Sequence, residues 1–354
     1  MRLCLWTRTL PSGGWIRAHF SRIPAAEAGG GRPTFPVPDH EGTLFAVVTD
    51  PEATRSRVSI YFKRDVKSCL TVADYRRCIV EDLYNNILNK LFYELTRRPT
   101  PPFICAYSFK KRFIRSKEFY VLSAGVRDDG IERGLEALMR EIVRVKRYGF
   151  TRSELDRQKK EMLRRIELMY DERGKTESRR FAAEYVLHFL AGEPIPGIEY
   201  KYELYKKYLP GIRLEEVNRL ADELITDDNR VVLINAPDKP GVEVPDEGEL
   251  LAVLRRVEEK RIEPYGEKVP GPLLVGVPPA PAEIVEKNRR EDLGITQWRL
   301  SNGISVILKP TDFKNDEVLF TAFSPGGHSL VPDEDGDVAG RRNGTSQGGR
   351  REDR

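Results

Sequence analysis

Residues 131–155, IERGLEALMREIVRVKRYGFTRSEL, contain two helix signals in direct succession. The first is a stripe of apolar residues at the period of an amphipathic helix: Ile131, Leu135, Leu138, Ile142 and Val145. Gly149 closes this stripe, and Thr151 followed by Glu154 is the pattern of a capping box that begins a second helix. Because an amphipathic helix must bury its apolar face, this stretch predicts a helical layer packed against another element.

The flanking sequence predicts strands for that layer to cover. Val58, Ile60 and Phe62 alternate with Ser, Tyr and Lys, the two-residue period of a half-buried strand. Further strand patterns lie at residues 43–49, 103–109, 118–125 and 230–236, and further helical patterns at 71–95, 178–190, 217–224 and 248–260. This order does not alternate regularly enough for a doubly wound fold. It predicts an α+β fold with helices packed on one face of a mainly antiparallel sheet.

The ends of the chain differ from this central part. Residues 1–38 hold a short helical fragment at 15–20 and a Gly/Pro loop, and the regular pattern occupies residues 39–265. Prolines make residues 266–294 a semi-extended linker, and residues 295–335 are predicted to be an incomplete further domain with strands at 298–310 and 317–323. Residues 336–354 hold five Gly and five Arg, so we expect a disordered tail.

Composition argues against several classes of protein. The 59 basic and 55 acidic side chains of the 354 residues leave a net charge of +4, and no nucleic-acid-binding motif is present, so we expect no nucleic acid partner. No apolar run reaches the roughly 18 residues of a membrane span. The four cysteines (Cys4, Cys69, Cys78 and Cys105) have neither zinc-ligand spacing nor the density of a disulfide framework, and we expect buried free thiols.

The usual catalytic and metal-binding motifs are missing. Zinc hydrolases with helical ligands need two histidines four residues apart, as in HExxH or HxxEH. No two of the four histidines lie within twenty residues of each other: His19, His40, His188 and His328. No phosphate-binding loop, GxSxG motif or Cys/His signature occurs either. The residues therefore predict no catalytic, cofactor-binding or metal-binding side chain.

A tyrosine-rich segment, IEYKYELYKKYL at residues 198–209, is the remaining candidate for function. Tyrosine at this density often supplies amphipathic contact area for a partner, which makes Tyr200, Tyr202 and Tyr205 candidate peptide-contacting residues. The alternative is that these rings pack at a domain surface with their hydroxyl groups in water, since tyrosine is only intermediate in burial.

Three stretches carry a resemblance to a known family. Residues 148–155, YGFTRSEL, look like a "GFT..EL" helix junction, and residues 181–205, with HFLAGEPIPG at 188–197, look like part of a bacterial second domain. Residues 300–310, LSNGISVILKP, look like an "L.NG..V.L.P" strand pair, which SPGGHSL at 324–330 continues. The order and spacing of these stretches resemble those of the pitrilysin/insulinase-like metallopeptidases, peptidase family M16. The resemblance covers roughly residues 15–335.

The resemblance implies a protein of two halves, each with two similar α+β domains, that closes around a chamber holding a peptide. Its first domain carries zinc through HxxEH, whose Glu activates water, and a later Glu. Residues 1–38 then hold the end of that first domain, residues 39–265 the non-catalytic second domain, and residues 295–335 the start of the third. For the full-length protein the resemblance implies zinc, a peptide or protein substrate, and an M16-type partner half.

The departure from the family is the missing HxxEH motif, so no catalytic or metal residue is transferred to this chain. We expect it to bind no zinc and to be inactive alone, and the abrupt ends of the resemblance suggest a truncated or frame-shifted gene.

The first hypothesis is that the chain is a fragment of an M16 zinc endopeptidase that contributes chamber wall and peptide-contacting surface. The second is a non-catalytic structural or partner subunit related to M16 proteins, which should still contain a complete first domain. The residues do not indicate a compartment.

Overall fold

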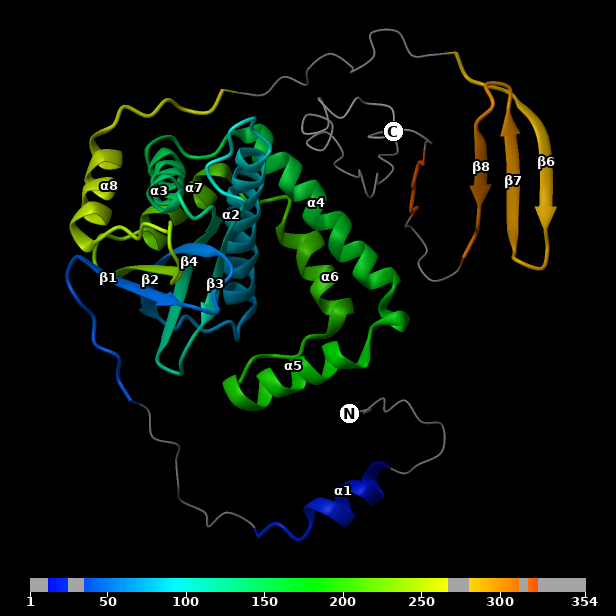
Figure 1. Ribbon diagram of the computed structural model, residues 1–354. Coiled ribbons are helices and arrows are strands. Elements are labelled where there is room, and N and C mark those ends of the chain that lie inside the picture. The colour runs from blue at the N-terminus through cyan, green and yellow to red at the C-terminus, as the bar shows by residue number, and fades with distance from the viewer. Residues whose placement is uncertain (1–11, 25–34, 267–279, 312–317, 324–354) are drawn as a thin grey trace. The chain divides into compact units, whose positions relative to one another are not determined.

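Figure 1 shows the computed structural model, which describes residues 12–24, 35–266, 280–311 and 318–323. The chain divides into two compact units, Met1–Val269 and Pro270–Arg354. Helix α1 (Ser12–Phe20) confirms the predicted helical fragment near the N-terminus. Among the described helices, none combines the length and apolarity needed to cross a membrane.

A five-stranded sheet in the order β1-β5-β2-β4-β3 forms the centre of the larger unit. Its strands are β1 (Thr43–Asp50), β2 (Ser56–Asp65), β3 (Cys105–Arg112), β4 (Lys117–Val126) and β5 (Arg230–Pro237). β2 pairs antiparallel with β4 and β5, and β3 pairs antiparallel with β4. β1 runs parallel to β5, so β5 lies between two strands that are neighbours in the sequence. The predicted α+β class is confirmed, and the parallel pair is an addition to the expected antiparallel pattern.

One layer of helices covers one face of this sheet. α2 (Val72–Thr96) and α3 (Ile131–Tyr148) contact the strands, while α7 (Leu214–Leu224) packs on α2 and α3, and α8 (Glu247–Glu259) packs on α3. Val58, Ile60 and Phe62 of β2 are buried in this core together with the whole predicted apolar stripe of α3. Each such side chain contributes about 1.5–3 kcal/mol when fully removed from water.

Three further helices extend from this layer. α4 (Arg152–Asp171) leads through the 3₁₀ turn η1 (Arg173–Lys175) to α5 (Ser178–Ala191), and α6 (Gly197–Tyr208) packs on α4 and touches α2. Leu204 of α6 is buried, whereas α5, which is described along its whole length, buries no residue. α4 and α5 were predicted. α6 was not, although Ile198, Tyr202, Tyr205 and Leu209 recur at helical spacing.

The junction between α3 and α4 explains why a glycine stands there. Gly149 has φ +71° and ψ −174°, a backbone conformation essentially restricted to glycine. A Cβ at this position would lie 2.3 Å from Asn218 Nδ2, and Asn218 Oδ1 accepts a hydrogen bond from Phe150 N at 2.9 Å. Phe150 is thereby placed in the core, with its ring 5.2 Å from that of Tyr84. Directly afterwards, Thr151 begins α4 with the predicted capping box.

The smaller unit contains a three-stranded antiparallel sheet, β6-β7-β8. Its strands are β6 (Ile284–Arg290), β7 (Ile295–Leu300) and β8 (Ser305–Leu308), so the pair predicted within residues 298–310 is present. β6 lies inside the segment 266–294 that the sequence assigned to a linker, because its mostly polar residues give no strand pattern. Residues 318–323 form no strand. The prediction of a strand at 317–323 is therefore wrong for the six residues of that range that the structure describes. The predicted tail at 336–354 lies outside the described residues.

The backbone at Gly149 yields a stability prediction. Gly149→Ala should lower the free energy of unfolding by roughly 2–3 kcal/mol, because it combines a strained backbone with a collision against Asn218. Gly192→Ala is a control without the collision, since Gly192 has the same φ of +71°, a ψ of 18° in the milder left-handed helical region, and nothing within 4 Å of the added Cβ. It should cost only about 1 kcal/mol. Urea unfolding of both variants measures the difference; equal losses would contradict the role given to the Asn218 contact.

Candidate functional site

The face of the large sheet that the helices leave uncovered is the first candidate site. Side chains alternate along a strand and paired residues share a face, so the strand registers place one set of apolar residues on the side opposite the core. We call this set the open face: Leu44, Val48, Tyr61, Tyr107, Phe109, Phe119, Val121, Val231 and Leu233.

None of the open-face side chains belongs to the cluster of buried residues between the sheet and the helices, although Val121 is itself only 2% exposed. Leu44 is 50% exposed, Val48 49% and Tyr107 38%. Single exposed apolar side chains are ordinary, but a contiguous set across five strands marks a surface for a ligand or another protein domain. The same registers place Arg57, Lys63, Lys111 and Lys117 on this side as well, so the open face combines apolar and basic side chains.

Aromatic contacts give the open face its shape. The Tyr61 and Phe119 rings meet edge-on with centroids 5.6 Å apart, and Tyr107 stacks on Phe109 at 5.8 Å. Phe113, in the turn after β3, extends this set because its ring centroid lies 4.9 Å from that of Phe119. Val121 lies between Tyr61 and Phe109, and in the next row of the sheet, beside Tyr107, the buried hydroxyls of Ser59 and Ser123 share a hydrogen bond of 2.9 Å. The aromatic side chains of this face can contact apolar side chains of a peptide.

The three tyrosines predicted to contact peptide lie on helix α6 but not on one side of it. Tyr200 is 49% exposed. Tyr202 faces α4, where its ring stacks on Tyr170 at 4.7 Å and its hydroxyl donates to Glu167 Oε1 at 3.3 Å. Tyr205 faces α2 and meets Tyr75 edge-on at 6.3 Å. The structure thus leaves Tyr200 the most accessible of the three and gives the other two packing partners.

Asp82 of α2 is the charged group beside Tyr205. The Tyr205 hydroxyl donates to Asp82 Oδ2 at 3.5 Å, and Tyr205 is itself half-buried. Asp82 is an exposed residue, and the protein packed around its carboxylate still desolvates it in part and raises its pKa above the ordinary 3.8. The charge of Arg165 opposes this rise. Desolvation and the nearby carboxylate likewise raise the pKa of Tyr205.

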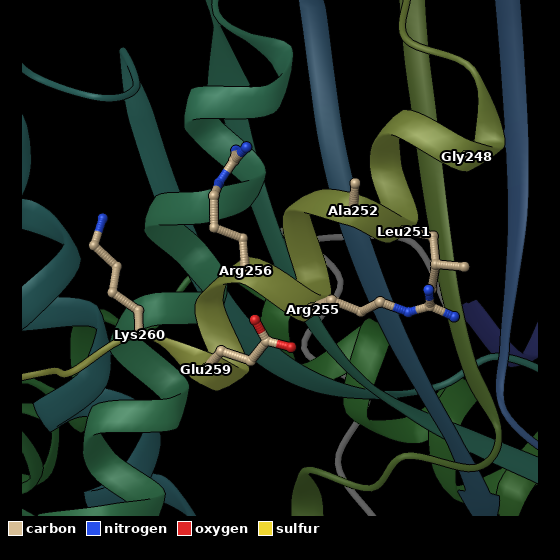
Figure 2. Close-up of a pocket in the computed structure, with 7 residues that line it drawn as sticks. All are labelled: Gly248, Leu251, Ala252, Arg255, Arg256, Glu259 and Lys260. Atoms are coloured by element: carbon tan, nitrogen blue, oxygen red, sulfur yellow. The ribbon is translucent and has the colours of Figure 1, made fainter.

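A shallow, open depression of about 790 Å³ lies along the outer side of α8. Figure 2 shows its lining, which comes from this one helix: Gly248, Leu251, Ala252, Arg255, Arg256, Glu259 and Lys260. Arg256 and Lys260 extend to the same side and both form ion pairs with Glu136 of α3, whereas Arg255 points away from them. The lining holds no nucleophile beside a base, so this surface has no arrangement for catalysis.

The histidines lie in separate parts of the described chain. His19 is exposed on α1, and His40 precedes β1 with its backbone N–H donating to Asn229 Oδ1. His188 of α5 is exposed, with its ring Nδ1 2.6 Å from Glu193 O. His328 lies outside the described residues. Within those residues, no group of three or more His, Cys, Asp and Glu side chains is placed to hold a metal ion.

Comparison with known proteins supplies the relationship. No protein-family profile matches the chain. A curated Arabidopsis thaliana protein, zinc protease PQQL-like, is 32% identical over 320 residues, which cover 90% of this chain and 30% of that protein. The probable zinc protease PqqL of Haemophilus influenzae is 20% identical over 289 residues, covering 81% of this chain and 31% of that protein. The chain belongs to the M16 family. The family recognised from the sequence motifs is confirmed.

Solved structures show the same fold. The periplasmic protease PqqL from Escherichia coli matches this M16 chain with a TM-score of 0.64 and 18% identity, over 92% of the chain and 36% of that protein. Its first half alone matches with a TM-score of 0.64 and 16% identity, over 72% of the chain and 55% of that structure. The ferredoxin protease FusC, in complex with Arabidopsis ferredoxin, matches with a TM-score of 0.56 and 17% identity, over 84% of the chain and 34% of that structure. The chain spans about a third of the curated relatives' length.

The raised pKa of Asp82 leads to a pH-dependent prediction. A carboxyl group whose pKa rises on folding holds its proton more tightly in the folded state, so its charge costs stability once the pH exceeds the ordinary 3.8. Asp82→Asn should therefore raise the melting temperature at pH 7, and the gain should vanish as the pH falls to about 3.

Asp128→Asn is the control with the opposite sign. The hydrogen bond from Lys239, 2.8 Å away, lowers the pKa of Asp128, so this carboxylate contributes stability above its unfolded pKa and loses it as the pH falls. Asp128→Asn should lower the melting temperature at pH 7 and leave it unchanged at low pH. Calorimetry between pH 3 and pH 7 measures both; a gain for Asp82→Asn that persists at pH 3 would count against desolvation as its cause.

Proposed function

We propose that this chain supplies the non-catalytic second domain of an M16-type zinc endopeptidase and that its open face lines the chamber that holds the polypeptide substrate. The observation that carries the proposal is the uncovered apolar and aromatic sheet face opposite the helical layer. An extended polypeptide presents alternating side chains, and apolar and aromatic side chains on a sheet face offer them contact area that tolerates many sequences.

The relatives support a polypeptide as the substrate class. Two curated relatives are named zinc proteases, and the structural neighbour FusC is a ferredoxin protease solved in complex with ferredoxin. For this chain, we propose that Tyr200, the most exposed of the α6 tyrosines, contributes a second contact region. The remaining walls of the chamber come from an M16-type partner half.

The proposed domain layout follows the sequence motifs. Residues 39–265 form the second M16 domain, residues 1–38 the end of the first, and residues 295–335 the beginning of the third. The coverage of the relatives supports this layout: the first half of PqqL aligns with 72% of the chain, and the whole protease aligns with 92%. The residues of this chain that match the whole protease but not its first half then belong to the second half of the protein.

Zinc, which the family implies, does not fit the donors of this chain. HxxEH is absent from the sequence, and the described histidines His19, His40 and His188 lie on separate segments without a converging carboxylate. We therefore place the metal and its water-activating base elsewhere in the full-length protein, and we assign no catalytic side chain to residues 1–354.

The purified chain should lack both zinc and peptidase activity. Without a metal-bound water and a carboxylate base, hydrolysis loses its main source of rate acceleration. Elemental analysis should find well below one zinc per chain, and cleavage of a quenched fluorescent peptide should equal the rate without protein. Stoichiometric zinc together with cleavage that a chelator abolishes would overturn the non-catalytic assignment.

The open face should bind unfolded polypeptide, and Tyr107→Lys should weaken that binding about tenfold, which corresponds to about 1.4 kcal/mol for one aromatic contact. The ligand is a fluorescein-labelled, carboxymethylated polypeptide that cannot fold, and anisotropy measures its Kd. Tyr93→Lys is the matched control, because Tyr93 is 52% exposed on α2, on the helical side of the sheet. Equal affinities of the two variants, with both folded by circular dichroism, would contradict the open face as the binding surface.

A further inference from the structure

Two cysteines meet at the beginning of α2. Cys69 lies two residues before the N-cap Thr71, Cys78 lies in the second turn of the helix, and their Sγ atoms are 2.6 Å apart. A disulfide bond measures about 2.05 Å, so the two sulfurs are already close to bonding distance. Both side chains are half-buried, in contrast to the buried thiols that the sequence predicted, and Cys105 is exposed. Cys4 lies outside the described residues.

The backbone on both sides of Cys69 is fixed to the helix. Arg77 Nη2 donates to Ser68 O at 2.5 Å, and Thr71 N donates to Asp74 Oδ2 at 3.1 Å. These hydrogen bonds hold the residues that flank Cys69 against the first turns of the helix that carries the other thiol. The two sulfurs therefore need no rearrangement of the chain to meet, which is the main geometric requirement for a disulfide.

The surroundings give the two thiols different roles. A hydrogen bond from Cys78, followed by the positive charges of Lys110 and Arg77, lowers the pKa of Cys69. The same hydrogen bond and burial raise the pKa of Cys78. Because the thiolate is the nucleophile in thiol chemistry, these directions favour Cys69 as the attacking thiol and Cys78 as the resolving one, an assignment that the variants below test.

We propose that Cys69 and Cys78 are a covalent modification site, at which a small-molecule disulfide such as glutathione disulfide oxidises them to an intramolecular disulfide. The Cys69 thiolate attacks one sulfur of the small disulfide, so that a mixed disulfide forms and one small thiolate leaves. The Cys78 thiol loses its proton and attacks Cys69 Sγ, and the second small thiolate leaves. Two protein thiols are oxidised, one small disulfide is reduced to two thiols, and the released protons end on those thiols.

The disulfide connects the segment between β2 and α2 to the helix. It closes a short loop in the unfolded chain and restricts that chain's freedom, which should raise the melting temperature by about 5 °C. The site also lies beside the contact between α2 and α6, because the ring of Tyr75, on the first turn of α2, meets that of Tyr205.

Peptide mapping of the full-length chain tests the site. The reduced protein is incubated with glutathione disulfide, its remaining thiols are alkylated, and it is digested with trypsin without reduction. Cleavage after Lys67, Arg76, Arg77 and Lys90 places the two cysteines on separate peptides, 68–76 and 78–90. We expect these two peptides to be joined by a disulfide, at a mass two hydrogens below their sum, and to separate after reduction.

Variants distinguish the attacking from the resolving thiol. Cys78→Ser should retain one glutathione on Cys69, because no second thiol can displace it, whereas Cys105→Ser should leave the linked peptides unchanged. The proposal is overturned if Cys69 and Cys78 remain alkylatable after a treatment that adds glutathione to the exposed Cys105. Linkage of either residue to Cys4 or Cys105 instead would also overturn it.

Discussion

A sheet with apolar side chains on both faces, but helices on only one, is the constraint on which the rest of this structure depends. Val58, Ile60 and Phe62 point into the helical layer and build the core, while Tyr61 and its neighbours on the other face have no such cover. α2, α3, α7 and α8 bury the first face with a continuous set of residues. The second face is thereby free for another protein segment, which is why the functional proposal rests on it.

The join between α3 and α4 sets the direction of the helices that extend from the core. Gly149, which has no Cβ, turns the chain beside Asn218. Phe150 then enters the core, and Thr151 caps the N-terminus of α4. These three steps in three consecutive residues explain the "GFT" motif in physical terms. A family motif that looks like a sequence signature is here a backbone conformation, a packing residue and a helix cap.

Periodicity in the sequence was enough to predict most helices and strands, the α+β class and the buried stripe of α3, because each depends on local pattern. Strand order was not predictable in the same way, since the pairing of β1 with β5 joins residues that are far apart in the chain. The open face was missed for that reason: Tyr61 alternates with the core residues of its strand, and only the strand register places Phe119 beside it. The α6 tyrosines were singled out by composition, but composition does not say which ring faces α4, α2 or solvent. Nor does spacing along the chain show that Cys69 and Cys78 touch.

The position of β5 bears on how this domain folds. β1 and β2 are joined by residues 51–55 alone, a connection short enough for an antiparallel hairpin, yet in the finished sheet they do not pair with each other. As the chain emerges from the ribosome, both strands are complete long before residue 230 is made. A β1–β2 hairpin would be a local competitor that has to open before β5 can enter between the two strands. The final sheet therefore depends on a non-local pairing, the kind of contact that slows folding.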